Sequence, residues 1–229
     1  MDSHESAVSA ALREAAEECG VPAGQVTVGA ILRDDHGGWS YQTVIAAARD
    51  QFPVRNASDE TSEVGWIGEG DVGRLDLHPG FAGQWPSLRA ALAPLTVIVD
   101  VANVMGSRAD GWWRDRAGAA IRLHGELTAL AVRGVPALPA EMAAPSLECW
   151  FPFLVLVLEG AARAALDHLP DDGRVRVVAA AGSGDDLIAD LAAQLPGQRL
   201  VVTADRELRG RCVSAGAAVT GPRWLLGML

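Results

Sequence analysis

Acidic side chains stand at the ends of four apolar runs in the second half of the chain, and their spacing favours metal-dependent chemistry. They are Asp100, Glu159, the pair Asp185 and Asp186, and Asp205. In an open parallel sheet the functional crevice lies at the carboxyl ends of the strands, so these acids are expected along one edge. Carboxylates gathered there would repel one another, and a bound Mg²⁺ or Mn²⁺ would relieve the repulsion. Such an ion activates water and stabilises charge on a phosphate. Alternatively, each acid taken singly could be a helix cap or a turn former.

Apolar runs and alanine-rich helical stretches alternate between residues 95 and 229. The expected strands are Thr96 to Val99, Phe153 to Leu158, Arg174 to Ala180, Leu200 to Thr203 and Ala217 to Val219. The expected helices are Trp112 to Ala131, Ala161 to His168, Asp185 to Gln194 and Arg206 to Ser214. This alternation is typical of a parallel sheet with helices on both faces. The fold class of the region is therefore α/β.

Three segments of this region resemble the metal-binding motifs of PIN-like nucleases, especially those of the NYN branch. They are Val97 to Ser107, Gly182 to Asp186, and Thr203 to Glu207. The resemblance covers about residues 95–229. It implies a five-stranded parallel sheet and Mg²⁺- or Mn²⁺-dependent ribonuclease activity. A rival of similar fold, the HAD-type phosphatase, needs a second aspartate where Ala102 stands.

The same resemblance implies roles for single residues. Metal ligands would be Asp100, Asp185 or Asp186, and Asp205, with Glu159 near the acid position of the second strand. Substrate contacts or orientation would come from Asn103, Ser183 and Arg206. Arg206, Arg209 and Arg211 could meet phosphates, or they could form a solvated face.

A second group of carboxylates lies near the N-terminus, on a helix predicted from about Glu5 to Cys19. Glu14, Glu17 and Glu18 are spaced i, i+3 and i+4, so they share one helical face. Carboxylates on one face repel unless a cation is bound, and Arg13 can pair with Glu17. Without further context such a face is usually only solvated.

The residues around these glutamates resemble the second half of the Nudix signature. The matching stretch is Arg13 to Val21, and Glu5 stands eight residues before Arg13, as the signature requires. The resemblance implies that Glu14, Glu17 and Glu18 hold Mg²⁺ against a nucleoside diphosphate, with Glu17 a catalytic carboxylate. The segments Arg33 to Tyr41, Trp66 to Ile67, and Leu77 to Phe81 also look like Nudix segments, and Glu60 or Glu63 is an auxiliary candidate.

The opening glycine of the signature would fall before Met1, and so would the early Nudix strands. We therefore expect a truncated Nudix segment with an incomplete core, exposed apolar sheet edges and weak or absent pyrophosphohydrolase activity. Strands are expected at Val26 to Leu32, Trp39 to Ala47 and Val64 to Ile67. Asp2 or Ser3 is expected to cap the first helix, and Gly20 followed by Pro22 to end it.

Composition narrows the function further. The 229 residues are 49% hydrophobic, so a core can form, and the formal net charge is −10. All 19 cationic residues are arginine, which excludes a Walker P-loop and a Schiff-base lysine and disfavours a protein that coats DNA. The three cysteines, Cys19, Cys149 and Cys212, are far apart, which favours a reducing cytoplasm. Neither a signal peptide nor a membrane span is predicted.

The sequence thus predicts a partial Nudix domain over residues 1–90 and a PIN-like domain over residues 95–229. The predicted function is hydrolysis of phosphodiester or pyrophosphate bonds with Mg²⁺ or Mn²⁺, on an RNA or nucleotide substrate. The alternative is a non-catalytic module that binds RNA or a protein and carries a vestigial Nudix segment. A cytoplasmic location is expected, and a homodimer is left open.

Overall fold

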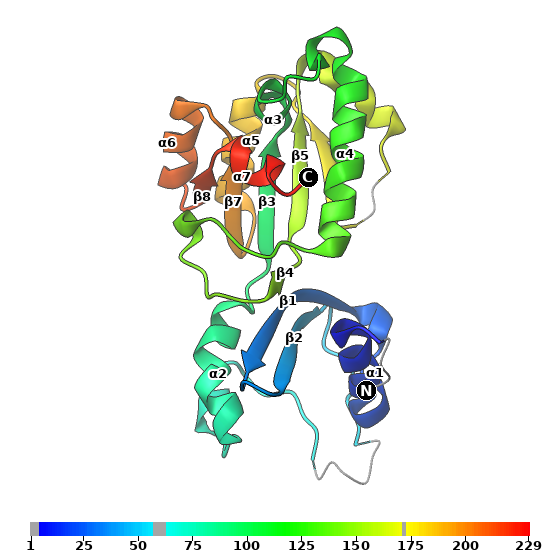
Figure 1. Cartoon of the computed structure of the whole chain (residues 1–229), viewed down its shortest axis with the longest axis vertical. Helices are drawn as coiled ribbons and strands as arrows, with labels where there is room; N and C mark the ends of the chain where they lie inside the picture. The colour runs from blue at the N-terminus through cyan, green and yellow to red at the C-terminus, as the bar shows by residue number, and fades with distance from the viewer. Residues whose placement is uncertain (1–4, 57–62, 171–172) are drawn as a thin grey trace. The chain divides into compact units, whose positions relative to one another are not determined.

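The chain folds into two compact units, which are described separately below (Figure 1). The computed structural model describes residues 5–56, 63–170 and 173–229. The first unit comprises the described part of residues 1–92 together with Pro145–Cys149. The second comprises Ala93–Ala144 and the described part of residues 150–229. The short stretch that joins the first unit from far along the chain was not predicted from the sequence.

The first helix, α1 (Ala7–Cys19), has defined caps at both ends. The side chain of Ser6 accepts a hydrogen bond from the Ser9 N–H at 3.1 Å, while Asp2 and Ser3 lie outside the described residues. At the other end Gly20 adopts φ +69°, a conformation that glycine reaches without the steric cost paid by other residues. The predicted end of the helix at Gly20 is therefore confirmed.

A long antiparallel hairpin forms the centre of the first unit. Strand β1 (Val26–Asp35) pairs with β2 (Ser40–Ala48), with a bulge between Val28 and Ala30. The third strand of the sheet is the short β4 (Cys149–Trp150), and the strand order is β2–β1–β4. Helix α2 (Pro79–Ala90) completes the unit together with the 3₁₀ turns Ala23–Gln25 and Val72–Arg74.

The strand expected at Val64 to Ile67 is absent, because these residues have no regular secondary structure. Glycines at 65, 68 and 70 weaken a strand there, since glycine has no side chain to pack on a sheet. Instead of extending a ladder, the Trp66 indole N–H donates to the Phe52 carbonyl oxygen at 2.7 Å. The segment is therefore held by this side-chain hydrogen bond and not by the strand pairing that its apolar pattern predicts.

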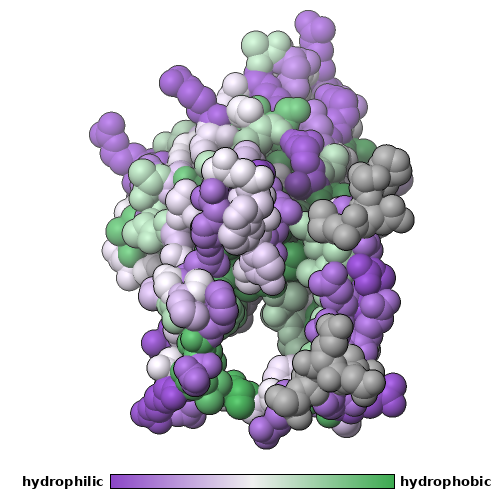
Figure 2. Space-filling model, turned by 60° about the horizontal axis from the view of Figure 1, so that its bottom comes forward, coloured by the Kyte–Doolittle hydropathy of each residue, from purple (hydrophilic) through white to green (hydrophobic). Residues whose placement is uncertain are grey.

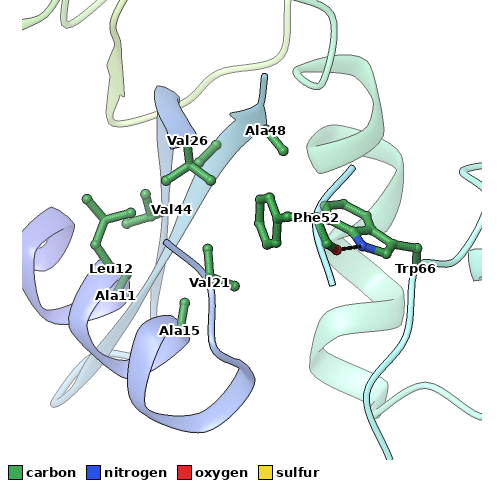
Figure 3. A pocket seen from close by; sticks show the side chains of 10 residues that line it. Ala11, Leu12, Ala15, Val21, Val26, Val44, Ala48, Phe52 and Trp66 are labelled. Carbon is green, nitrogen blue, oxygen red and sulfur yellow. Dashed lines mark hydrogen bonds between the residues drawn. The ribbon is translucent and has the colours of Figure 1, made fainter. Parts of the chain in front are cut away.

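The core of the first unit is loosely filled between α1 and the sheet. Ala11, Leu12 and Ala15 of the helix face Val44 of β2 across a cavity of about 250 Å³ (Figure 3). Large apolar side chains are also exposed in this unit; examples are Trp39, Tyr41, Trp66, Ile67 and Leu75. In Figure 2, hydrophobic residues reach the visible surface between hydrophilic ones.

The second unit contains a five-stranded, wholly parallel sheet in the order β6–β5–β3–β7–β8. The strands are β3 (Leu95–Asp100), β5 (Phe153–Leu158), β6 (Val175–Ala179), β7 (Gln198–Val202) and β8 (Ala218–Thr220). The predicted α/β class and five-stranded parallel sheet are thus confirmed. The first strand of this unit, β3, lies in the centre of the sheet between β5 and β7. The carboxyl ends of these three parallel strands are therefore neighbours.

Helices cover the sheet of the second unit. They are α3 (Val101–Gly106), α4 (Arg116–Arg133), α5 (Gly184–Gln194), α6 (Arg206–Ser214) and α7 (Pro222–Leu226), with 3₁₀ turns Trp112–Arg114 and Ala140–Met142. One core cluster joins Ile98, Val157 and Val201 of the sheet to Ile188 of α5 and Leu208 of α6. Burial of these aliphatic side chains, each worth about 1.5–3 kcal/mol, holds the strand ends in register.

Two helices of the second unit differ from the sequence expectation. The segment Gly160–His168 is a 3₁₀ helix, with its bonds tightened from the α pattern. The stretch expected from Trp112 is divided, because Asp115 caps a new helix at Arg116 by accepting from the Gly118 N–H at 2.8 Å. Among the helices in the described ranges, none has the length and apolar character needed to cross a membrane.

Candidate functional site

Asp100 lies at the carboxyl end of the central strand β3 and is almost fully buried, with 5% of its surface exposed. Its Oδ1 accepts from the Asn103 backbone N–H at 3.0 Å, which caps α3. Its Oδ2 accepts from the Asn103 side chain at 2.8 Å and from the Thr203 hydroxyl at 2.7 Å. Burial raises the pKa of Asp100, these hydrogen bonds oppose the rise, and the Glu159 charge adds to it.

Asn103 and Thr203 join Asp100 to the loop after β7. The Asn103 Oδ1 accepts from the Ala204 N–H at 3.2 Å, and the Thr203 Oγ1 accepts from the Asp205 N–H at 3.1 Å. Thr203 is completely buried, and its hydroxyl donates to Asp100 and accepts from the Asp205 N–H inside the protein. Sequence reasoning did not assign Thr203 to the site; the signal for it was a hydroxyl residue at a strand end, two residues before an acid.

Glu159 follows β5, beside Asp100 in the sheet. Its Oε2 accepts from the Gly184 N–H, the first residue of α5, at 3.0 Å. A Cβ placed on Gly184 would lie 2.6 Å from this oxygen, so only glycine permits the approach. The bond holds Glu159 against the N-terminus of α5, where negative charge is favoured.

The two adjacent acids of α5 point to different neighbours. The pKa of Asp185 is raised, first by burial and then by the charges of Asp100, Asp205 and Glu159. Asp186 is largely exposed and accepts from the Arg211 guanidinium at 2.8 Å. Asp185 is therefore influenced by the charges of the strand-end acids, whereas Asp186 pairs with Arg211, a distinction that the spacing of the motif could not make.

Asp205 caps α6, since its Oδ1 accepts from the Leu208 N–H at 2.7 Å. Of the three nearby arginines, Arg209 donates to the carbonyl oxygens of Thr203 and Val219, and Arg211 is occupied by Asp186. Arg206 is exposed beside Asp205. Ser183 is also exposed, at the N-cap of α5, and its side chain makes no capping bond.

The glutamates of α1 form a separate group in the first unit. Glu14 and Glu17 are both exposed and both pair with Arg13, at 3.5 Å and 3.0 Å. Arg13 also bonds Glu5 at 3.2 Å, and this contact is the largest cause of the raised pKa of Arg13. Glu18 is exposed on the same helix. One guanidinium thus compensates much of the negative charge on this face.

Comparison with known proteins finds relatives that match part of the chain. No protein-family model matches the chain. A Mycobacterium tuberculosis protein, provisionally named 8-oxo-dGTP diphosphatase 3, is 40% identical over 105 residues, which cover 42% of this chain and 46% of that protein. A nucleoside triphosphate pyrophosphatase/Nudix hydrolase fusion protein of Bifidobacterium longum is 33% identical over 93 residues, covering 40% of this chain and 19% of that one. The chain is thus similar, over part of its length, to a protein named as a diphosphatase and to a Nudix hydrolase fusion protein.

The matched stretch spans about half the length of the mycobacterial protein. Among solved structures, a mutant form of Rae1 (YacP) of Bacillus subtilis superposes with a TM-score of 0.41 at 18% identity, covering 58% of this chain and 72% of that one.

The strand-end carboxylates of the second unit fit a divalent cation by the chemistry of their oxygen donors. Burial and the Glu159 charge raise the pKa of Asp100, and burial and the charges of Asp100, Asp205 and Glu159 raise the pKa of Asp185. In the described part of the chain no three acidic, histidine or cysteine side chains already surround one metal position. Mg²⁺ does not require such a cage, because it keeps several waters and uses one or two carboxylates together with substrate phosphates.

Proposed function

We propose that the PIN-like unit is a divalent-metal-dependent hydrolase that cleaves phosphodiester bonds in RNA. The observation that supports the proposal is that burial, followed by the charges of Asp100, Asp205 and Glu159, raises the pKa of Asp185 at the carboxyl edge of the sheet. Mg²⁺ or Mn²⁺ bound there would supply an activated water and would neutralise charge on the phosphate.

In this proposal Asp100, Asp185 and Asp205 provide the metal ligands, and Glu159 provides a further carboxylate on the β5 side. Asn103 and Thr203 act as positioning residues, because they hold the Asp100 carboxylate from both sides. Asp186, which is paired with Arg211, keeps that guanidinium next to the acidic edge.

Arg206 and Ser183 are the proposed contacts for substrate phosphate. Both are exposed at the N-termini of helices that begin at the acidic edge, where backbone N–H groups also favour an anion.

The test is cleavage of single-stranded RNA by the full chain with Mn²⁺. Asp100→Asn should abolish cleavage, because it removes the central carboxylate charge. Asp190→Asn is the matched control, since it changes an exposed acid on α5, one turn beyond Asp186. Cleavage that survives in the Asp100 variant would contradict the proposal. A wild-type chain that binds RNA but does not cleave it would favour the non-catalytic alternative.

A second candidate function, pyrophosphate hydrolysis on α1, is favoured by the Nudix relatives. Their names describe a diphosphatase and a pyrophosphatase/Nudix hydrolase fusion, and Glu14, Glu17 and Glu18 lie on α1, the helix whose residues resemble the Nudix signature. We infer a weak activity on nucleoside triphosphates, because Arg13 engages two of these glutamates and Mg²⁺ must compete with it.

Mg²⁺-dependent release of pyrophosphate from 8-oxo-dGTP measures this second activity. Glu17→Gln should remove it, whereas Glu69→Gln, which alters an exposed glutamate paired with Arg89, should not. Equal loss or equal retention in both variants would rule out a role for the α1 face.

A further inference from the structure

Trp113 is an exposed tryptophan on the turn between α3 and α4. It leaves 57% of its surface exposed, whereas the other tryptophans of the second unit, Trp112, Trp150 and Trp224, are buried or half-buried. Burial of so large an apolar ring contributes strongly to folding and to binding. At Trp113 most of that contribution is unused in the free protein.

The turn lies on the same side of the sheet as the strand-end acids. Helix α3 begins directly after Asp100, and its six residues rise about 9 Å to Gly106. Strands β3 and β5 are parallel neighbours, so α4, which lies between them in the chain, must start near the carboxyl end of β3 and run back. Figure 1 shows α3 at this end of β3. The 3₁₀ turn Trp112–Arg114 is therefore on the side of the acidic edge.

Local hydrogen bonds fix the shape of this turn. The Asp110 Oδ1 accepts from the Trp112 N–H at 3.1 Å, and the Gly111 carbonyl oxygen accepts from the Arg114 N–H at 3.0 Å. Gly111 has φ +79°, a conformation that suits glycine. Asp115 ends the turn by capping α4. The backbone that carries the two tryptophan rings is thus well defined.

Trp112 supports the Trp113 ring. A Cβ placed on Gly106 would lie 3.7 Å from a ring carbon of Trp112, so this ring rests against the end of α3. The Arg116 guanidinium lies over the Trp112 ring, 5.2 Å from its centroid. The two indole rings meet edge to face, with 6.3 Å between centroids and 87° between planes. Trp112 is therefore packed, whereas Trp113 presents its ring to solvent.

The neighbours of Trp113 along the turn are polar. Four charged side chains close to it in the chain are exposed: Asp110, Arg114, Asp115 and Arg116. A protein interface needs a buried core to which several side chains contribute, and one ring among charged groups does not provide it. A nucleobase needs only one ring face for stacking, and its edges are polar. The local chemistry therefore favours a base as the group that covers Trp113.

We propose that Trp113 stacks on a base of the single-stranded RNA that the acidic edge takes as substrate. The proposal rests on the RNA substrate proposed above and adds a contact away from the metal ligands. Because every base has a π-face, the contact should tolerate any sequence. Because the indole ring is neutral, it should leave the salt dependence of binding unchanged. Duplex RNA should not use the contact, since its bases are already paired and stacked.

The test is binding of a labelled single-stranded oligoribonucleotide to the full chain, measured by fluorescence polarisation. Ca²⁺ replaces Mn²⁺, because it is a hard cation that neutralises the same carboxylates, and a gel checks that the RNA stays intact. Trp113→Ala should weaken binding about tenfold, and Trp113→Phe should keep most of the affinity. Trp39→Ala is the matched control, because Trp39 is a similarly exposed tryptophan of the first unit.

The expected loss in Trp113→Ala supports the proposal if Trp113→Phe and Trp39→Ala bind well, the salt slope is unchanged and each variant is folded by circular dichroism. Wild-type affinity in Trp113→Ala overturns it, and so does a wild type that does not bind single-stranded RNA. An equal loss for duplex RNA also overturns it. A dimer that Trp113→Ala dissociates would show that a second copy covers the ring, which again overturns it.

Mn²⁺-dependent cleavage separates this contact from the proposed hydrolase. Trp113→Ala should raise KM about tenfold and leave kcat near the wild-type value, because the ring contacts the substrate away from the reacting phosphate. RNA that binds through Trp113 but is not cleaved would contradict the hydrolase alone. RNA that Trp113→Ala cleaves with an unchanged KM would contradict the stacking contact alone.

Discussion

Thr203 is a buried residue whose hydroxyl connects the Asp100 carboxylate to the backbone of Asp205. It donates to Asp100 and accepts from the backbone of Asp205. Because it is fully buried, no water can replace it when it is removed. Its contribution therefore includes both folding stability and the charge state of Asp100.

Thr203→Val should lower the free energy of unfolding by about 1–3 kcal/mol, because the Asp205 N–H loses its buried acceptor. It should also raise the pKa of Asp100 further, since a hydrogen bond that favours the charged carboxylate is lost. Urea denaturation and the pH profile of RNA cleavage measure the two effects. Thr203→Ser keeps the hydroxyl and should restore the wild-type profile; an unaltered profile in the valine variant would refute this role.

Asp185→Asn should stabilise the metal-free protein at neutral pH, by about 1–2 °C in Tm. The folded-state pKa of Asp185 is raised, so the folded protein holds this proton more tightly than the unfolded chain. Ionisation consequently costs stability as pH rises through the folded pKa, and that cost is absent below the ordinary value of 3.8.

Thermal melts of both proteins on each side of that range, with a chelator present, measure the difference. The stabilising effect of Asp185→Asn should disappear at the acidic end. A variant that is less stable at neutral pH would contradict the repulsion inferred among the four acids.

At the residue scale the sequence predicted which strand ends carry acids, because apolar runs and their end residues are local features. It could not separate Asp185 from Asp186, since both begin the same helix and only the position of Arg211 distinguishes them. The pairing of Arg13 with Glu17 could be anticipated from their i,i+4 spacing, whereas the bond of Arg13 to Glu5, which precedes the helix, could not.

At the scale of elements, Asp205 has two roles that substitutions can separate. It caps α6 through Oδ1, and its charge raises the pKa of Asp185. Asp205→Asn should preserve the cap and the stability but lose RNA cleavage. Asp205→Ala should lose cleavage and also about 0.5–2 kcal/mol of stability.

Chemical denaturation and the Mn²⁺-dependent cleavage assay, performed on both variants, check this separation. Wild-type cleavage by Asp205→Asn would show that only the cap matters.

The parallel strands of the second unit were predictable because each is a continuous buried run between helices. The 3₁₀ form of Gly160–His168 was not, because the α and 3₁₀ patterns share the same residues and differ only in bond register. The irregular path at Val64 to Ile67 was also missed, because a side-chain bond to Phe52 decides it.

At the scale of the whole molecule, the net charge of −10 should make RNA binding weakly dependent on salt. Binding through Z cationic contacts gives a log–log slope of about −0.7Z for single strands. Near the acidic edge Arg209 and Arg211 are engaged within the protein, which leaves Arg206 as the proposed contact.

We therefore expect a slope of about −0.7 for wild-type RNA affinity, measured by fluorescence polarisation over a range of salt concentrations. Arg206→Gln should bring the slope close to zero. A steep slope, typical of strongly basic nucleic-acid-binding proteins, would show that other arginines carry the contact.

The stretch Pro145–Cys149 belongs to the first unit, although residues of the second unit precede and follow it. During translation the hairpin of the first unit leaves the ribosome long before its third strand is made. The first unit therefore lacks its last segment until Ala93–Ala144 has been synthesised. A single cut in the gene consequently cannot separate the coding sequences of the two complete units. Recombination that exchanged one unit would have to move this five-residue stretch together with the first unit.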